Sequence, residues 1–131
     1  MYKNKHIVSK RKSTVARIYL KEGNNKFIIN KFFYKDYFKN NIFILNKLYN
    51  FFIDYKIKIN KYNLYINIYG GGINGQVEAI IYGLAKMFFK YKIIDLNKIK
   101  NSMLLRTDCR RVERKKFGKK KARKSFQFSK R

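Results

Sequence analysis

The sequence contains no proline and no tryptophan, and it has only one cysteine, one histidine and seven acidic residues among 131. With the lone Cys109 no disulfide can form within the chain, which is typical of a protein in a reducing compartment. One cysteine also provides too few ligands for a zinc site, so we expect no metal and no cofactor. No apolar run reaches the length of a membrane span, and residues 1–10 lack the apolar core of a signal peptide. We therefore expect no membrane association, and a protein that works in the compartment where it is made.

The same scarcity argues against an enzyme. His6 has no cysteine or acid near it in the sequence, so we interpret it as a structural residue or a nucleic-acid contact. Ser13 and Ser129 have no histidine and aspartate to activate them. Asp108 and Glu113 lie among arginines, where we expect them to hold guanidinium groups by bidentate pairing. An enzyme would have to work with almost no general acid or base.

Basic residues, in contrast, are abundant. The 33 Lys and Arg give a formal net charge of +26. A charge of this size makes a compact monomer repel itself, and lasting association with a polyanion relieves the repulsion. Lys, Asn, Ile, Tyr and Phe are residues of A/T-rich codons, so their abundance indicates an A/T-biased genome and inflates the lysine count. That bias does not explain the shortage of acids.

The densest charge lies in residues 110–131, where twelve Lys and Arg stand against Glu113 alone, a net +11 over twenty-two residues. Because the segment has too little apolar content to fold alone, we expect it to stay extended until a polyanion orders it. Phenylalanines spaced between the cations suit a chain that neutralises phosphates and touches bases or sugars. The alternatives are a solvated charge run and a patch resembling a nuclear-localisation signal.

The remaining residues, 1–109, predict one globular α+β domain. Short apolar runs and two-residue alternation predict strands at 5–9, 14–20 and 27–29, and the turn residues at 22–25 predict that the second and third form a hairpin. A further strand, at 62–69, is predicted to be central and to place Leu64, Ile66 and Ile68 on one face.

Apolar residues spaced three and four apart predict the helices. One covers 41–53 with Asn41 as its N-cap, one turn lies within 31–39, and the longest runs from about Val77 to Tyr91. A shorter helix is predicted to start at Asp95, with its carboxylate as the cap and with Leu96 and Ile99 turned inward.

A glycine cluster, Gly70-Gly71-Gly72-Ile73-Asn74-Gly75-Gln76, separates the predicted central strand from the longest helix. Such a turn can bind phosphate through bare backbone N–H groups and the helix dipole. The cluster lacks the Lys-Ser or Lys-Thr pair of a Walker A motif and the spacing of a dinucleotide-binding turn. Three interpretations stay open, namely a nucleotide site, a grip on a nucleic-acid phosphate, and a tight connection without a ligand.

Four motifs, in order along the chain, resemble those of the small ribosomal subunit protein nine family of the bacterial and organellar type. They are Ser-Lys-Arg-Lys-Ser-Thr-Val-Ala-Arg at residues 9–17, the glycine cluster, Leu-Arg-Thr-Asp at 105–108 with Arg-Val-Glu-Arg-Lys-Lys at 111–116, and the terminal Phe-Ser-Lys-Arg. Each motif alone is weak, but their order and spacing together are specific. This chain has Ser9 where the family usually has glycine.

The resemblance implies a mostly four-stranded sheet with helices packed on one face, like the second domain of small-subunit protein five, and a tail reaching the ribosomal P site. It implies binding to rRNA in the head of the small subunit, beside neighbouring ribosomal proteins. The implied rRNA contacts are Lys10, Arg11, Lys12, Arg17, Gly70, Gly71, Gly72, Asn74, Gly75, Gln76, Arg106, Arg110, Arg111, Arg114, Lys115, Lys116, Lys119, Lys120, Lys121, Arg123 and Lys124. The implied contacts with the anticodon stem-loop of the P-site tRNA are Ser129, Lys130 and Arg131.

The implied location is the ribosome of a plastid or mitochondrion with an A/T-rich genome, or of an A/T-rich bacterium. Two other classes stay open. A free basic protein that coats organellar DNA would tolerate a scrambled tail of equal charge. An enzyme related to small-molecule kinases, which share this fold, would need nucleotide turnover dependent on Gly71 and Gly72.

Overall fold

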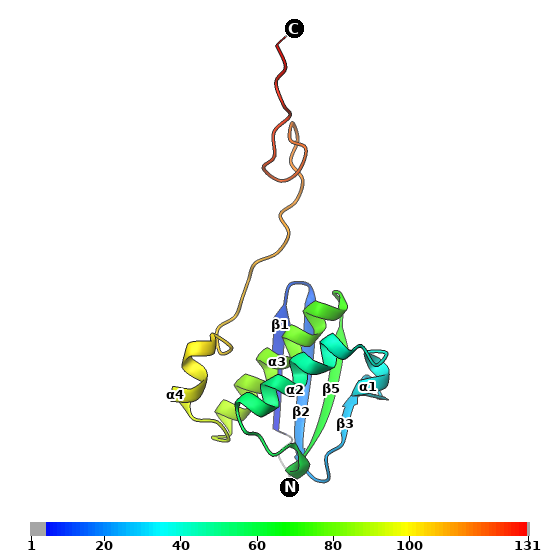
Figure 1. The fold of residues 1–131 in the computed structure, drawn as a ribbon, viewed down its shortest axis with the longest axis vertical. Coiled ribbons are helices and arrows are strands. Elements are labelled where there is room, and N and C mark those ends of the chain that lie inside the picture. The colour runs from blue at the N-terminus through cyan, green and yellow to red at the C-terminus, as the bar shows by residue number, and fades with distance from the viewer. Residues whose placement is uncertain (1–4, 131) are drawn as a thin grey trace.

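A computed structural model describes residues 5–130 and shows a five-stranded mixed sheet with helices on one of its faces (Figure 1). Residues 1–4 and Arg131 lie outside the described residues, so the predicted tRNA contact of Arg131 does too. The strands are β1 (Lys5–Arg11), β2 (Thr14–Glu22), β3 (Phe27–Ile29), β4 (Phe32–Phe33) and β5 (Tyr62–Tyr69). The helices are α1 (Tyr34–Tyr37), α2 (Ile42–Asp54), α3 (Ile73–Lys90) and α4 (Leu96–Ile99), with 3₁₀ turns at Ile59–Lys61 and Lys100–Ser102. The predicted α+β class is confirmed, with a two-residue fifth strand added to the four expected.

The strand order is β1-β2-β5-β3-β4, which makes β5 the central strand, as predicted. The predicted hairpin of residues 14–20 with 27–29 is wrong, because β5 lies between β2 and β3 and pairs with both. In the turn after β2, the Gly23 amide donates to the carbonyl of Lys61, which immediately precedes β5, at 3.1 Å. This bond holds the turn beside the start of β5. Two other hairpins form: β1 pairs with β2 across Lys12 and Ser13, and β3 pairs with β4 across Asn30 and Lys31.

Alternation along the strands divides the sheet into a covered and an open face. Ala16, Ile18 and Leu20 of β2 are buried under the helices, as are the predicted Leu64, Ile66 and Ile68 of β5. The residues between them, such as Arg17 and Tyr69, point to the opposite face, which no helix covers among the described residues.

Two helices supply most of the cover. The Asn41 side chain accepts from the amides of Phe43 and Ile44, at 3.2 and 3.5 Å, so the predicted N-cap of α2 is confirmed. Helix α3 begins four residues earlier than predicted, and it lies across β1 and β2 (Figure 1). Buried Ser9 fixes this crossing, because its hydroxyl donates to the Ala79 carbonyl at 2.6 Å.

The predicted helix at Asp95 forms as the single turn α4, but two details are wrong. The Asp95 carboxylate makes no capping bond and instead lies 3.6 Å from the Lys98 ammonium. Ile99 is buried as predicted, whereas Leu96 is exposed, because a one-turn helix at the edge of the body offers only one side chain to the core. No described helix has the length and apolar content that crossing a membrane requires.

Candidate nucleic-acid interface

Residues 110–130 leave the body as a long arm without helix or strand (Figure 1). The last buried core residue is Ile99, and the basic side chains of the arm are exposed apart from half-buried Lys119. The arm therefore presents its cations to the surroundings and contributes nothing to the apolar core.

The arm carries one small loop of its own. Glu113 accepts from Arg123 at both carboxylate oxygens, at 2.6 and 2.9 Å, and the pairing lowers the pKa of Glu113. A turn at Gly118, with φ of +71°, lets the Lys119 amide donate to the Lys116 carbonyl. The bidentate pairing predicted for Glu113 is confirmed, and it occupies the single acid of the arm.

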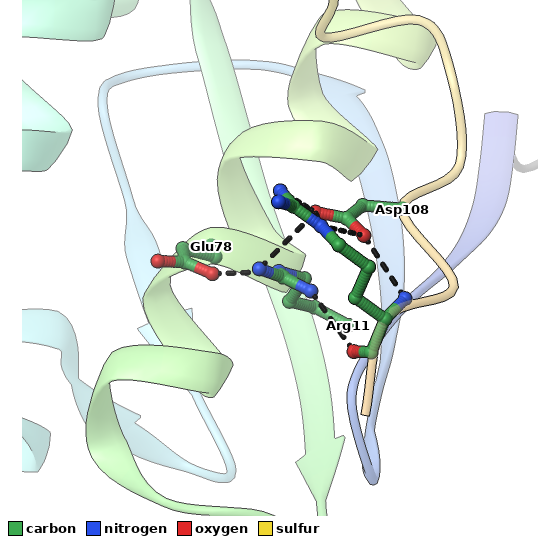
Figure 2. Close-up of polar contacts among 4 residues, drawn as sticks. Arg11, Glu78 and Asp108 are labelled. Carbon is green, nitrogen blue, oxygen red and sulfur yellow. Dashed lines mark hydrogen bonds and ion pairs between the residues drawn. The ribbon is translucent and has the colours of Figure 1, made fainter. Parts of the chain in front are cut away.

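At its root the arm is fixed to the body by contacts among four residues, Arg11, Glu78, Asp108 and Arg110, which we call the tail clasp; Figure 2 labels the first three. The Arg11 guanidinium donates to Glu78 of α3 at 2.7 Å, lies 3.2 Å from Asp108, and donates to the Arg110 carbonyl at 3.4 Å. Asp108 in turn accepts from the Arg110 guanidinium at 2.8 and 3.0 Å and from its amide at 3.0 Å. The bidentate pairing predicted for Asp108 is confirmed as well.

The contacts within the clasp shift the pKa values of its charged groups. Donation from the Arg110 guanidinium and then its amide holds the pKa of Asp108 well below the usual carboxyl range, with Arg11 adding its charge. The bond to Glu78, followed by the charge of Asp108, raises the pKa of Arg11 although burial opposes this. The Arg11 side chain keeps only 11% of its surface exposed. Its guanidinium is thus engaged within the chain, and its contact with RNA stays a prediction.

The clasp yields a prediction for the mobility of the arm. We expect Arg11→Gln to free the root of the arm, because glutamine cannot bridge Glu78, Asp108 and the Arg110 carbonyl together. A nitroxide attached to exposed Cys109 should then give a narrower, more mobile electron paramagnetic resonance spectrum. Arg17→Gln, an exposed arginine on the same hairpin, is the matched control and should leave the spectrum unchanged. Equal spectra for wild type and Arg11→Gln would contradict the clasp.

The same label should report a dependence on pH. Because the folded pKa of Asp108 lies below its unfolded value, ionised Asp108 stabilises the clasp at every pH above about 4. This contribution is lost only as the pH falls through the folded pKa. We expect constant mobility from about pH 8 to pH 5 and a rise only in stronger acid, while Asp108→Asn should be mobile throughout. A transition near neutral pH would refute the assignment.

The glycine cluster is shaped by the β1–β2 hairpin. Gly70 and Gly71 have φ of +76° and +68°. A Cβ on Gly70 would lie 2.6 Å from the Ser13 carbonyl oxygen, and a Cβ on Gly71 would lie 2.0 Å from the Thr14 hydroxyl. The buried Thr14 hydroxyl donates to the Gly70 carbonyl at 3.2 Å, and buried Gly75 lies against Thr14 as well. These contacts favour the interpretation of the cluster as a tight connection, at least for these three glycines.

The hairpin tip and the start of α3 lie together at the end of the body towards which the arm rises (Figure 1). Lys10, Lys12, Gly72 and Asn74 are exposed there, whereas Gln76 is half-buried and donates to the Gly70 carbonyl at 3.4 Å. Arg17 lies apart on the open sheet face, and Arg106 is exposed near the clasp. The predicted contacts thus divide among the arm, the clasp at its root, this tip and the open face.

Two residues at the root of the arm are missing from the sequence prediction. Glu78 anchors Arg11, and the Lys86 ammonium donates to the Thr107 hydroxyl at 3.2 Å. Glu78 is the only acid in α3, and an isolated acid in so basic a chain is a signal that could have marked it. Within residues 5–130 no three His, Cys, Asp or Glu side chains gather as they would around a metal ion.

Comparison with known proteins gives a consistent result. A family model described as Ribosomal protein S9/S16 matches residues 9–131. The small ribosomal subunit protein uS9 of Borrelia turicatae (strain 91E135) is 46% identical over 129 residues, which cover 93% of this chain and 88% of that protein. The Borrelia hermsii (strain HS1 / DAH) protein of the same name is 47% identical with the same coverage. That of Chlorobium luteolum (strain DSM 273 / BCRC 81028 / 2530) is 40% identical and covers 95% of both chains.

Proposed function

This chain belongs to the ribosomal protein S9/S16 family and is a structural, non-enzymatic constituent of the small ribosomal subunit, and we propose that its basic arm carries its contacts with RNA. As such a constituent it associates with rRNA and with other ribosomal proteins. In our proposal, residues 1–109 anchor the protein in the head of the subunit and residues 110–131 reach through rRNA to the P site.

The observation that carries this proposal is the arm itself. It concentrates a net +11 in twenty-two residues, and its one acid is already paired with Arg123. Phosphate neutralisation by Lys and Arg releases counterions and supplies most of the sequence-independent affinity for RNA. An arm fixed at its root but free of the core can follow the rRNA surface while the body stays docked.

We further propose that the end of the arm, Ser129, Lys130 and Arg131, contacts the anticodon stem-loop of the P-site tRNA. The Ser129 and Lys130 side chains are exposed. The arginine fork can pair with a phosphate at two oxygens, and the lysine ammonium adds a second cation.

Sedimentation tests the assignment of the arm and body to rRNA. A native lysate is run on a sucrose gradient at moderate and at high salt, and this chain is followed together with small-subunit rRNA. We expect co-migration that survives salt able to strip nonspecific basic proteins. Release to the top fractions, or migration with DNA, would favour a DNA-coating protein instead.

Removing only residues 130–131 tests the tRNA contact. Because Lys130 is exposed and every described core residue lies at or before Ile99, we expect the shortened chain to form subunits of normal sedimentation. Those subunits should release P-site tRNA several times faster than wild type. Filter retention of labelled initiator tRNA on purified subunits measures the effect. A matched variant, Lys115→Gln with Lys116→Gln, removes two charges from the middle of the arm and should leave tRNA retention near wild type. Defective head assembly after the terminal deletion would contradict this division of labour.

A further inference from the structure

We propose that the open face of the sheet binds a single-stranded segment of RNA, with unpaired bases on the rings of Tyr65 and Tyr69 and phosphates at Lys10, Arg17 and Lys21. The proposal rests on the proposed function, because the RNA within reach of a small-subunit constituent is rRNA. It adds a second binding surface, distinct from the arm.

Strand register brings these residues to one face. Lys10 of β1 pairs with Val15 of β2, which pairs with Tyr69 of β5. Two residues along β2, Arg17 pairs with Asn67. Successive side chains on a strand point to opposite faces, so residues in these rows share the face opposite the helices.

The next rows complete this face in the same way. Tyr19 pairs with Tyr65, and Lys21 pairs with Asn63. The cations are therefore interleaved with tyrosine rings along the whole length of the β2–β5 ladder.

Rings and cations are already in contact. The Arg17 guanidinium lies 5.9 Å from the centre of the Tyr69 ring, and the Lys21 ammonium lies 5.6 Å from the centre of the Tyr65 ring. Both are diagonal cross-strand pairs with the same offset, so the face repeats one ring-and-cation unit. Each unit offers a π-surface for a base beside a charge for its phosphate.

The charge of the face is of one sign. All seven acids of the chain lie elsewhere. Glu22, the only acid in a strand, has the parity of Ile18 and Leu20 and so belongs to the face that the helices cover. Tyr69 keeps 53% of its surface exposed, and Arg17, Lys10 and Lys21 are exposed. A surface with cations and no anions is complementary to phosphate, whereas a neighbouring basic ribosomal protein would be repelled.

The apolar side chains of this face continue the row of Tyr65 onto β3 and β4, as Ile28 and exposed Phe33. The rows on either side of it contain Arg17 and Lys21, so charge rather than apolar content favours RNA over a protein partner. Tyr65 and Tyr69 are four residues apart, about 13 Å along an extended strand. Successive bases in a helix lie about 3.4 Å apart, which is much less than the distance between the two rings. Two neighbouring bases can therefore stack on both rings only where the RNA strand is extended, so the face fits an extended strand better than a helix.

Directed hydroxyl-radical cleavage tests the proposal in assembled subunits. In a Cys109→Ser background, Asn67→Cys places one thiol at the centre of the open face. We expect that thiol to be shielded from a maleimide in the subunit, and iron tethered there before assembly to cleave a confined set of rRNA nucleotides. A shielded thiol without rRNA cleavage would assign the face to a protein, and a reactive thiol would show it open to solvent; either result overturns the proposal. Ser129→Cys, probed in parallel, reports on the arm, so failure of one surface is distinguished from failure of the other.

Affinity measurements with the full chain and a short unpaired RNA oligonucleotide provide a second test. We expect Tyr69→Leu to weaken binding about tenfold and Tyr69→Phe, which keeps the ring, to stay near wild type. Arg17→Gln should lower the slope of log affinity against log salt by about 0.7, the value for one phosphate of a single strand. Lys47→Gln, an exposed lysine on α2, is the control of equal charge and should leave that slope unchanged if the oligonucleotide lies on the open face. Wild-type affinity for Tyr69→Leu with an unchanged slope for Arg17→Gln would overturn the proposal.

Discussion

Deleting residues 112–131 is expected to remove most of the salt-dependent affinity for RNA while leaving the body folded. The deletion takes away ten Lys and Arg and one Glu, so the formal net charge falls from +26 to +17. Each phosphate contact contributes about 0.7 to the salt slope on a single strand and about 0.9 on a duplex. If all ten cations bind phosphate, the slope becomes shallower by about 7 to 9.

The cut after Arg111 is chosen so that the tail clasp stays intact. Every buried core residue lies at or before Ile99, so the free energy of unfolding should change little. Titration of rRNA fragments at several salt concentrations measures the slope, and circular dichroism checks the fold. A variant with the same arm residues in scrambled order should keep the slope but fail to support P-site tRNA retention. If the deletion leaves the salt slope unchanged, the phosphate contacts belong to the body and not to the arm.

Gly70→Ala is expected to destabilise the body by about 2–5 kcal/mol. Its φ of +76° strains a residue with a Cβ, and that Cβ would meet the Ser13 backbone carbonyl at 2.6 Å, which cannot rotate away. Left-handed backbone at a non-glycine residue costs about 1–2 kcal/mol, and overpacking costs about 1–3 kcal/mol more. The substitution should therefore push the glycine cluster away from the tip of the β1–β2 hairpin.

Gly72→Ala is the matched control, two residues along the same loop. Its φ is −99°, and a Cβ there would meet nothing within 4 Å, so we expect a change below about 0.5 kcal/mol. Urea unfolding followed by circular dichroism measures both variants. Equal effects of the two substitutions would show that the hairpin contact does not set the conformation of the loop.

Local patterns predicted the local structure well. Alternation in residues 14–20 and 62–69 identified two strands and their buried faces, because side-chain direction in a strand depends only on parity. Asn41 was identifiable as a cap because the cap and the amides it bonds lie within three residues. Leu96 shows the limit of periodicity, since a single turn at the edge of a body has no core to face on a second side.

Long-range arrangement escaped prediction where it depended on partners far along the chain. The turn residues at 22–25 resemble a hairpin turn, yet β3 pairs with residues 62–69 on the side where β2 was expected. The tail clasp joins Arg11 to Glu78 and Arg110, which are 67 and 99 positions away. The local Asp108–Arg110 pair could be predicted from spacing, whereas nothing near Arg11 in the sequence distinguishes it from Lys10 and Lys12.

The place of β5 in the sheet has a consequence for how the chain folds. Among the strands of residues 5–130 it is the last in the sequence, yet it forms the middle of the sheet and joins the β1–β2 hairpin to β3 and β4. Until residues 62–69 arrive, the inner edges of β2 and β3 have unpaired backbone groups facing each other, and their direct pairing would be a kinetic trap. Folding to the native sheet should therefore be limited by the insertion of this strand, with a slow phase set by long-range pairing rather than by helix formation.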